Sequence, residues 1–182
     1  MNSPLSEDAA LGRRALLGAA AEVLSEHGLD APLELIAERA GVGRDTLTRD
    51  FPDRLALAVA VIAQEVDDLA ERTRSWAGEA DVFLWLLEQL ADLCVRNAAV
   101  LDALRSAAPR ALAPLRCTIL EAGGRALRDA QDAGLVRADL KASDILAIAT
   151  LLGAGLSGDL AERQTVSLRT REIILGGLKT RG

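Results

Sequence analysis

The polar side chains best suited to bind another molecule lie in the stretch 44–50, which reads RDTLTRD. The stretch has the length of a short helix and follows the break Gly41-Val42-Gly43. A second helix after a short glycine-containing turn is the helix-turn-helix arrangement, in which that helix can enter the major groove of DNA. An ordinary helical hairpin is the alternative interpretation.

The residues before the break would position this stretch. Leu33–Ala40 carries a helical pattern. Gly41 suits the left-handed residue just past a helix end, because it lacks a Cβ that would clash there. Val42 can then lie in the crook between the two helices. Apolar residues from both helices would complete a small wedge-shaped core: Ile36, Ala37, Ala40 and Leu47.

Residues for catalysis or metal binding are scarce. His27 is the only histidine, and its place before a glycine at a predicted helix end fits a partner for the helix dipole. The two cysteines, Cys94 and Cys117, lie far apart and lack metal-type spacing. Gly123-Gly124 lies inside a helical pattern with no strand before it, so it is no nucleotide fingerprint. We therefore expect no enzymatic activity, no metal and no cofactor.

The composition predicts an all-α protein. Of the 182 residues, 50% are hydrophobic and only 2% aromatic, while alanine and leucine dominate and β-branched runs are scarce. The longest uncharged apolar run, Ile145–Gly158, is shorter than the ~20 residues that a membrane span needs. Arg13-Arg14 before an apolar run superficially suggests an export signal, but acidic residues on both sides argue against one. We expect a cytoplasmic protein with reduced thiols and no membrane partner.

Helical spacing recurs along the chain and predicts about nine helices. Asp53 has the character of an N-cap for the fourth helix, and Ser143 for the eighth. The boundary between an N-terminal three-helix head and a larger helical domain falls near Phe51–Asp53, which predicts domains of residues 1–52 and 53–182. The expected helices cover residues 9–27, 33–40, 44–50, 53–76, 81–97, 99–107, 109–134, the stretch after 143, and 166–179.

The order of residues around the glycine turn resembles the TetR family of bacterial transcriptional regulators. In words, the pattern of that family is IA…AGV…TLY.HF..KE.L after a helix that ends in glycine, and residues 20–28 (AAEVLSEHG) supply that earlier helix. The resemblance is strong over Leu16–Val61, and beyond it only length and helicity agree. The matching pieces are Ile36-Ala37, Ala40-Gly41-Val42, Thr46-Leu47, Phe51, Asp53-Arg54 and Leu57.

The resemblance implies a ligand-responsive DNA-binding transcriptional regulator, with repression as the expected sign of control. It also implies a homodimer whose paired recognition helices enter successive major grooves of a palindromic operator. A helical bundle with a degenerate DNA-binding head, acting as a ligand-binding, structural or adaptor module, is the alternative. By resemblance, Arg44, Asp45 and Thr48 face base edges, and Thr46, Arg49 and Arg54 lie nearer phosphates.

The last two predicted helices carry more apolar residues than one buried face needs, which predicts burial on more than one side. The resemblance implies a four-helix dimer interface built from these helices of two subunits. Closure of a monomeric core by the same helices is the alternative. The candidate interface residues are Ile145, Ile148, Leu152, Ile173, Ile174 and Leu178.

A candidate small-molecule pocket lies where three of the four aromatic residues cluster within ten positions. Such pockets are typically apolar with a few placed polar groups, and the fifth predicted helix offers this mixture. Family members commonly bind an inducer between the corresponding helices, so we expect an apolar or aromatic effector; plain core packing is the alternative. The candidate pocket residues are Trp76, Phe83, Trp85, Gln89, Cys94 and Cys117.

Charge and two departures from the family pattern predict a weak grip on DNA. Residues 1–58 hold six arginines against ten Asp and Glu, a net charge of −4, whereas the remaining residues carry −2. An acidic head is unfavourable because DNA affinity comes largely from neutralised phosphates. Thr48 and Asp50 stand where the family most often has Tyr and then His or Tyr. We favour a weakened grip; an unusual operator contact by Asp50 is the alternative.

Overall fold

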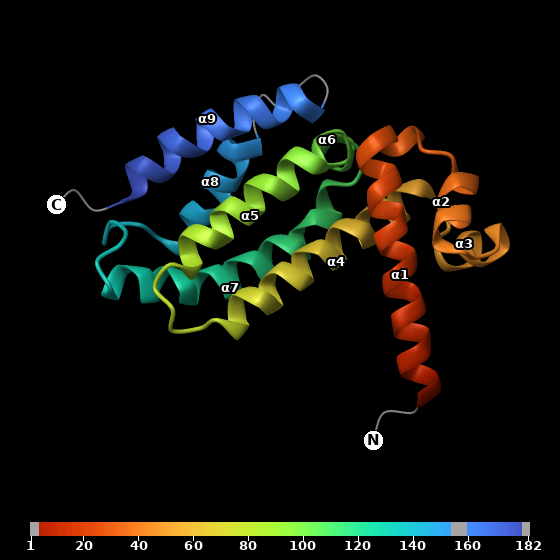
Figure 1. Ribbon diagram of the computed structural model, residues 1–182, viewed down its shortest axis with the longest axis horizontal. Coiled ribbons are helices and arrows are strands. Elements are labelled where there is room, and N and C mark those ends of the chain that lie inside the picture. The colour runs from red at the N-terminus through yellow and green to blue at the C-terminus, as the bar shows by residue number, and fades with distance from the viewer. Residues whose placement is uncertain (1–3, 154–159, 180–182) are drawn as a thin grey trace. The chain divides into compact units, whose positions relative to one another are not determined.

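The computed structural model describes residues 4–153 and 160–179, which are mostly helical (Figure 1). Within these ranges, nine α-helices and two short 3-10 helices follow one another along the chain. The chain divides into two compact units, residues 1–65 with 99–112 and residues 66–98 with 113–182. In the same described ranges, no helix is both long enough and apolar enough to cross a membrane. The all-α prediction is confirmed.

The first unit contains α1 (Pro4–His27), α2 (Leu33–Ala40), α3 (Arg44–Asp50) and most of α6 (Ala98–Ala107). α1 packs against α2, and α2 packs against α3. Burial follows the helical period of the sequence, because the apolar residues of α1 recur on one face. The buried residues of α1 are Leu16, Leu17, Ala20, Val23 and Leu24.

The helix-turn-helix has the predicted boundaries. Gly41 takes φ 66° and ψ 27°, the left-handed conformation expected just past the end of α2. Its N–H donates to the Glu38 carbonyl at 3.1 Å, and the Val42 N–H donates to the Ala37 carbonyl at 3.0 Å. This Schellman arrangement satisfies carbonyls that the helix end would leave unpaired, and it fixes the direction in which the chain enters α3.

α4 (Arg54–Ser75) is one continuous helix that contributes to both units. As predicted, Asp53 caps it, since the Asp53 Oδ1 accepts a 2.7 Å hydrogen bond from the Ala56 N–H. Its first half belongs to the first unit and its second half to the other. The buried apolar residues along it are Leu57, Ala58, Val61, Ile62, Val66, Leu69 and Ala70.

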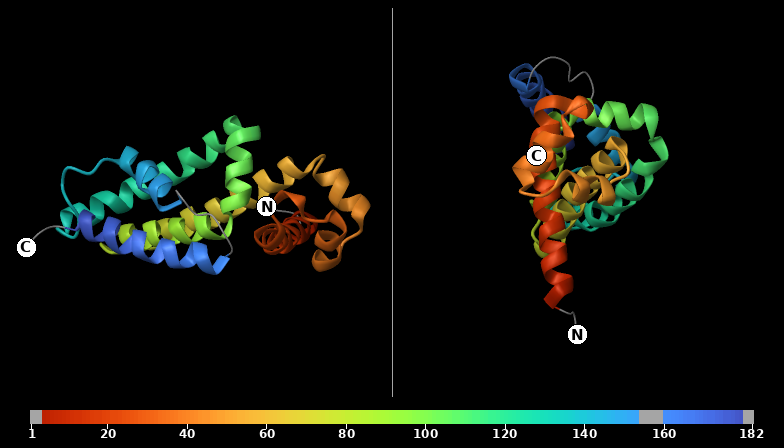
Figure 2. Two further views of the ribbon diagram at one scale, coloured as in Figure 1. Left: turned by 90° about the horizontal axis from the view of Figure 1, so that it is seen from above. Right: turned by 90° about the vertical axis from the view of Figure 1, so that its right-hand side faces the viewer.

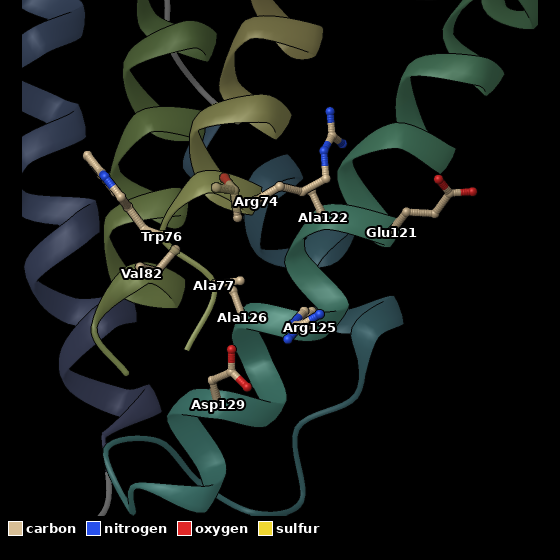
Figure 3. A pocket seen from close by; sticks show the side chains of 10 residues that line it. Arg74, Trp76, Ala77, Val82, Glu121, Ala122, Arg125, Ala126 and Asp129 are labelled. Carbon is tan, nitrogen blue, oxygen red and sulfur yellow. The ribbon is translucent and has the colours of Figure 1, made fainter. Parts of the chain in front are cut away.

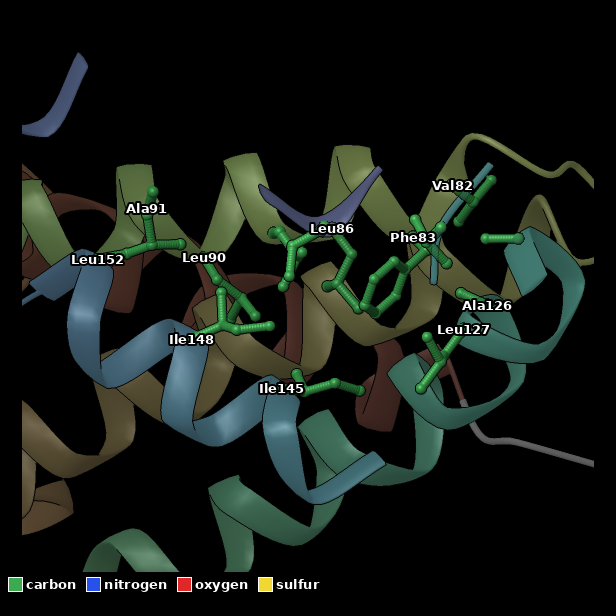
Figure 4. Close-up of a cluster of buried hydrophobic side chains, with 14 of the residues drawn as sticks. Val82, Phe83, Leu86, Leu90, Ala91, Ala126, Leu127, Ile145, Ile148 and Leu152 are labelled. Atoms are coloured by element: carbon green, nitrogen blue, oxygen red, sulfur yellow. The ribbon is translucent and has the colours of Figure 1, made fainter. Parts of the chain in front are cut away.

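α5 (Val82–Arg96) is the centre of the second unit. It packs against α7 (Ala113–Asp132), α8 (Ala142–Gly153) and α9 (Leu160–Leu178) (Figures 1 and 2). One face of α5 interlocks with α7 and α8 in a continuous apolar core (Figure 4). The large side chains of this core include Phe83, Leu86, Leu87, Leu90, Leu127, Ile145 and Leu152.

Polar contacts join elements of the second unit. On α9, the Arg171 Nη2 donates to the Asp92 Oδ1 of α5 at 2.6 Å, and the Arg163 Nη1 donates to the Val95 carbonyl at 3.0 Å. Between α7 and α8, the Arg137 guanidinium donates two hydrogen bonds to the Asp139 carboxylate. These bonds hold the pKa of the Asp139 carboxyl below its usual value.

Four predicted helix starts are wrong. α7 begins at Ala113 rather than at residue 109, and Pro109–Leu112 forms a 3-10 helix. α1 begins at Pro4 rather than at residue 9, because a proline followed by acidic residues suits a first helical turn. α9 begins at Leu160 rather than at 166, so its first polar turns were mistaken for a loop. Ser143 lies inside α8, where Asp144 does the capping: its Oδ2 accepts a 2.8 Å hydrogen bond from the Lys141 N–H.

Candidate nucleic-acid interface and cavity

The outward face of α3 is polar and exposed. Arg44, Asp45 and Thr48 lie on it, one turn or less apart, whereas Leu47 points inward and is 1% exposed. Phe51, just past the helix, is buried as well. A seven-residue helix has little stability of its own, so these two inward anchors and the Schellman turn hold it in place. The three residues predicted to face base edges therefore share one exposed face.

Both arginines of α3 are paired with carboxylates of the same unit. The Arg44 Nη1 lies 2.7 Å from the Glu34 Oε1 on α2, and both side chains are more than 60% exposed. The Arg49 Nε lies 3.3 Å from the Asp50 Oδ1. Exposed pairs of this kind contribute only about 0–1 kcal/mol, so another anion can replace the carboxylate at little cost.

The threonines of α3 differ in what they offer. The Thr48 hydroxyl donates back to the Arg44 carbonyl at 3.1 Å, which leaves its oxygen lone pairs facing outward. Thr46, predicted to lie nearer the phosphates, is half-buried. Of the two, only Thr48 stands fully exposed on the outward face.

Arg54, also predicted to lie near phosphates, has internal partners. Its Nη1 donates to the carbonyls of Leu29 and Ala31, at 2.9 and 2.7 Å. These carbonyls belong to the connection between α1 and α2, so Arg54 ties the start of α4 to that connection. The motif Asp53-Arg54 gave no sign of this, because the carbonyls it reaches lie more than twenty residues earlier in the chain.

Two further arginines of the first unit are engaged. The Arg13 guanidinium carbon lies 4.9 Å from the centroid of the Phe51 ring, within range of a cation–π contact. The Arg39 Nη1 lies 3.8 Å from the Glu22 carboxylate and 3.5 Å from the Glu26 carboxylate. Carboxylates thus pair with Arg39, Arg44 and Arg49, whereas Arg13 contacts an aromatic ring and Arg54 contacts backbone carbonyls.

The second unit contains a cavity of about 230 Å³ between the end of α4, the loop that follows it, and α7 (Figure 3). Its floor is apolar, and charged side chains stand at its rim. The lining residues are Thr73, Arg74, Trp76, Ala77, Val82, Glu121, Ala122, Arg125, Ala126 and Asp129.

The structure brings only one of the predicted pocket residues to this cavity, Trp76. Phe83 and Cys94 are buried on the core face of α5, and Cys117 is exposed on α7. Trp85 contacts Trp76 edge-on, and both Trp85 and Gln89 are half-buried. The stripe on α5 is thus mainly core packing, the alternative left open by the sequence.

The α7 residues of the cavity were missed by the sequence analysis. Ala122 and Ala126 are small residues one turn apart, and Arg125 and Asp129 are charged residues at the same spacing. This spacing puts all four on neighbouring faces of one helix. Sequence alone offers no sign that this side of α7 faces the end of α4.

Four of the six predicted interface residues lie in the core of their own subunit: Ile145, Ile148, Leu152 and Leu178. Ile174 is half-buried against the same core. Ile173 is 61% exposed on α9, where Val166 and Leu168 are exposed too, and Leu151 is exposed on α8. The apolar surface that α8 and α9 leave uncovered therefore consists largely of residues other than those predicted.

Two family descriptions match the chain. Residues 16–61 match "Bacterial regulatory proteins, tetR family", and residues 77–180 match "Transcriptional regulator SbtR-like, C-terminal domain". The second match covers more than half of the sequence. Among curated proteins, none matches this chain.

Similar solved structures cover nearly the whole chain. The TetR transcriptional regulator SCO0520 from Streptomyces coelicolor is 30% identical with a TM-score of 0.75, over 93% of this chain and 99% of its own. The TetR transcription regulatory protein from Mycobacterium vanbaalenii is 30% identical with a TM-score of 0.73, over 97% and 100%. The transcriptional regulator FadR from Bacillus subtilis, solved in complex with stearoyl-CoA, shares the fold at 16% identity and a TM-score of 0.60, over 91% and 99%.

Proposed function

The chain belongs to the TetR family of bacterial transcriptional regulators, and we propose that it is a cytoplasmic repressor that releases a palindromic operator when it binds a small molecule. As a member of this family it is a ligand-responsive DNA-binding regulator. The sign of regulation, the operator symmetry and the residues in contact are the proposal. The observation that carries it is the exposed polar face of α3, fixed in place by Leu47 and the turn at Gly41.

In the proposed complex, α3 lies in the major groove and Arg44 reads a base. Its Nη1 lies beside Glu34, while its Nε and Nη2 remain available for the O6 and N7 acceptors of a guanine. Arg49 turns from Asp50 to a phosphate. Because both internal pairs are weak, the exchange costs about 0–1 kcal/mol for each pair. That exchange lowers affinity without preventing binding, which agrees with a weak grip.

Arg54 has a different role in this proposal from the one its motif implied. Its guanidinium is occupied by the carbonyls of Leu29 and Ala31, so it positions the head rather than holding a phosphate. A hydrogen bond to a charged group is stronger than a neutral one, at about 1.5–3 kcal/mol. We expect Arg54 to act through the geometry of the head.

A homodimer would place two copies of α3 in successive grooves. The exposed apolar residues of α8 and α9 supply a surface for the second copy: Leu151, Val166, Leu168 and Ile173. Scattered exposed apolar residues are common, but these come from adjacent helices, which makes them a candidate interface. Among the six residues named from sequence, Ile173 is the one that this surface retains.

The test uses the whole protein with two synthetic DNAs. One carries an inverted repeat taken from the region upstream of its own gene, with centres about 34–36 Å apart, and the other carries a single half-site. Sedimentation velocity at micromolar concentration should give a dimer, and the inverted repeat should bind far more tightly than the half-site. A monomer, or equal affinity for the two DNAs, would contradict the proposal.

The paired arginines of the first unit favour one alternative, a degenerate head that no longer binds DNA. The same titration separates the two cases. A dimer that prefers no sequence and shows a shallow salt dependence would point to the degenerate head. Binding that weakens steeply with salt, as counterion release requires, would support the regulator.

A further inference from the structure

We propose that the cavity between the end of α4, the loop that follows it and α7 is the effector site, and that it takes a small aromatic carboxylate. This inference rests on the proposed ligand-responsive function, because it names the effector class of that regulator. It differs from the pocket predicted on α5, since the cavity lies on the side of α4 and α7 and shares only Trp76 with that prediction.

The floor of the cavity suits the apolar part of such a ligand. Val82, Ala122 and Ala126 are at most 4% exposed and close it from below. Thr73, 2% exposed, donates its hydroxyl to the Leu69 carbonyl of its own helix. The volume of about 230 Å³ is below the ~300–1,000 Å³ range of pockets for drug-sized ligands, so the site fits a compact molecule.

Trp76 lines the cavity from the loop after α4 and contacts a second tryptophan. It is 43% exposed at the rim, yet its ring meets the Trp85 ring edge-on with centroids 4.8 Å apart. The Arg72 guanidinium lies 5.4 Å from the centroid of Trp85 on α5. Aromatic pairs of this geometry are favourable beyond the surface they bury, so the contact with Trp85 favours this position of the Trp76 ring.

Arginine side chains at the rim can bind an anion. Within the part of the chain that the structure describes, neither Arg74 nor Arg125 forms an ion pair with a carboxylate. Asp129 is already used, because its Oδ2 accepts a 3.0 Å hydrogen bond from the Gly78 N–H. The Glu121 carboxylate points away from the centre of the cavity (Figure 3). Either guanidinium can therefore bind an external carboxylate with two parallel hydrogen bonds.

Other charges near the cavity oppose an anion. The cavity lies at the C-terminal end of α4, where the helix dipole places a partial charge of about −0.5, and the carboxylates of Glu121 and Asp129 equal the two arginines in number. The preference for an anion therefore rests on the guanidinium groups of Arg74 and Arg125, which have no carboxylate partner among the described residues, and not on net charge. A cation would face both arginines, and a neutral aromatic molecule would leave them unused.

The neighbouring core is filled, which directs a ligand to this cavity instead. A Cβ added at Gly123 would meet the Ile145 Cδ1 at 2.7 Å and the Leu86 Cδ2 at 3.0 Å. Such distances show that α7 packs closely against α5 and α8 at this point. The cavity lies beside this closely packed point, over the small side chains of Ala122 and Ala126.

Helix α4 runs from the head to the site. Thr73 and Arg74 belong to the last turns of α4, whose first residue, Arg54, is bonded to the α1–α2 connection. If a ligand binds more tightly to the protein with α4 in one position than in another, it shifts the population of molecules toward the first position. Occupation of the cavity can thus act on the head through α4.

The experiment is isothermal titration calorimetry on the full chain without DNA. The probes are benzoate, phenylacetate and 2-naphthoate, each compared with its neutral amide. We expect at least one acid to bind, with its amide weaker by about tenfold or more, because a hydrogen bond to a charged group is worth at least that factor. If no acid binds, or if acid and amide bind equally, the proposal is overturned.

Matched variants locate the binding. Arg125→Gln and Arg74→Gln should each weaken binding of the acid by about tenfold or more. Arg128→Gln, an exposed arginine of α7 outside the cavity, should leave it unchanged. Equal effects of Arg125→Gln and Arg128→Gln would place the ligand elsewhere and overturn the assignment. Because no DNA is present, failure of operator binding would contradict the proposed function without affecting this result.

Discussion

The arginines of the head and those of the cavity lie in opposite electrostatic situations. In the head, Arg44 and Arg49 are paired with carboxylates of the same unit, although both lie on the exposed α3. At the cavity, Arg74 and Arg125 have no carboxylate partner among the described residues. An arginine with its own carboxylate must exchange partners before it binds an external anion, whereas an unpaired one does not. The two proposals therefore differ in one condition: the head must exchange partners to bind DNA, whereas the proposed effector site need not do so to bind an acid.

The largest effect should come from the arginine that serves the structure of the head. Arg54→Gln removes two charge-assisted hydrogen bonds to the Leu29 and Ala31 carbonyls, and we expect a loss of about 2–3 kcal/mol in stability. DNA affinity should fall with an unchanged salt slope, because no phosphate contact is lost. Chemical denaturation and salt titrations measure the two quantities. Arg49→Gln is the control; a lower salt slope for Arg54→Gln would restore its role at a phosphate.

Next in size is the base-reading residue. Arg44→Ala should weaken operator binding by about 1–3 kcal/mol and relax specificity at a single base pair. Binding assays on operators with each base pair replaced in turn show this directly. Weakening that is uniform over all positions would assign Arg44 to the backbone instead.

A smaller gain is expected where the sequence departs from its family. Asp50→His removes a negative charge that lies 3.3 Å from Arg49, so DNA binding should tighten across many sequences and become steeper in salt. Anisotropy titrations at several salt concentrations provide the measurement. If the natural operator alone is no longer bound, Asp50 is a specific reader, for instance of a cytosine amino group, and the weak-grip interpretation fails.

The smallest effect belongs to the partner of Arg44. Glu34→Gln should tighten DNA binding by about 0.2–1 kcal/mol, the range measured for exposed pairs, because the guanidinium no longer has to leave a carboxylate. Glu38→Gln changes the net charge of α2 equally at another exposed position. Equal gains in the two variants would mean that net charge, rather than the pair, sets the affinity. Weaker binding in Glu34→Gln would mean that Glu34 orients Arg44.

The parts of the fold that sequence predicted well are those with local causes. The boundaries of α2 and α3 follow from Gly41, since only a residue without Cβ takes that conformation freely. The cap at Asp53 depends on a residue three positions away. Both signals lie within a few residues of the feature that they determine.

The site was harder to predict because tertiary packing determines it. The aromatic stripe on α5 has the same pattern whether it faces a pocket or a core, and Phe83 proves to face the core. Likewise, Ile145 would be apolar whether it faced a second subunit or the core of its own chain. In the structure, α5 and α7 cover it. The partners of Arg54 lie far away in the sequence, and so does the surface that α7 offers to α4. The spacing of apolar residues along a helix shows which face is buried, but it does not show which element of the same chain, ligand or second subunit packs against that face.

The most direct test of the account is the release of operator DNA by an aromatic acid. A labelled inverted-repeat operator bound to the protein is titrated with 2-naphthoate, and its fluorescence anisotropy is followed for the natural chain, Arg125→Gln and Arg128→Gln. The account predicts release from the natural chain and from Arg128→Gln at similar concentrations, and at concentrations about tenfold or more higher from Arg125→Gln. Release at equal concentrations from all three, or no release from the natural chain, would contradict it.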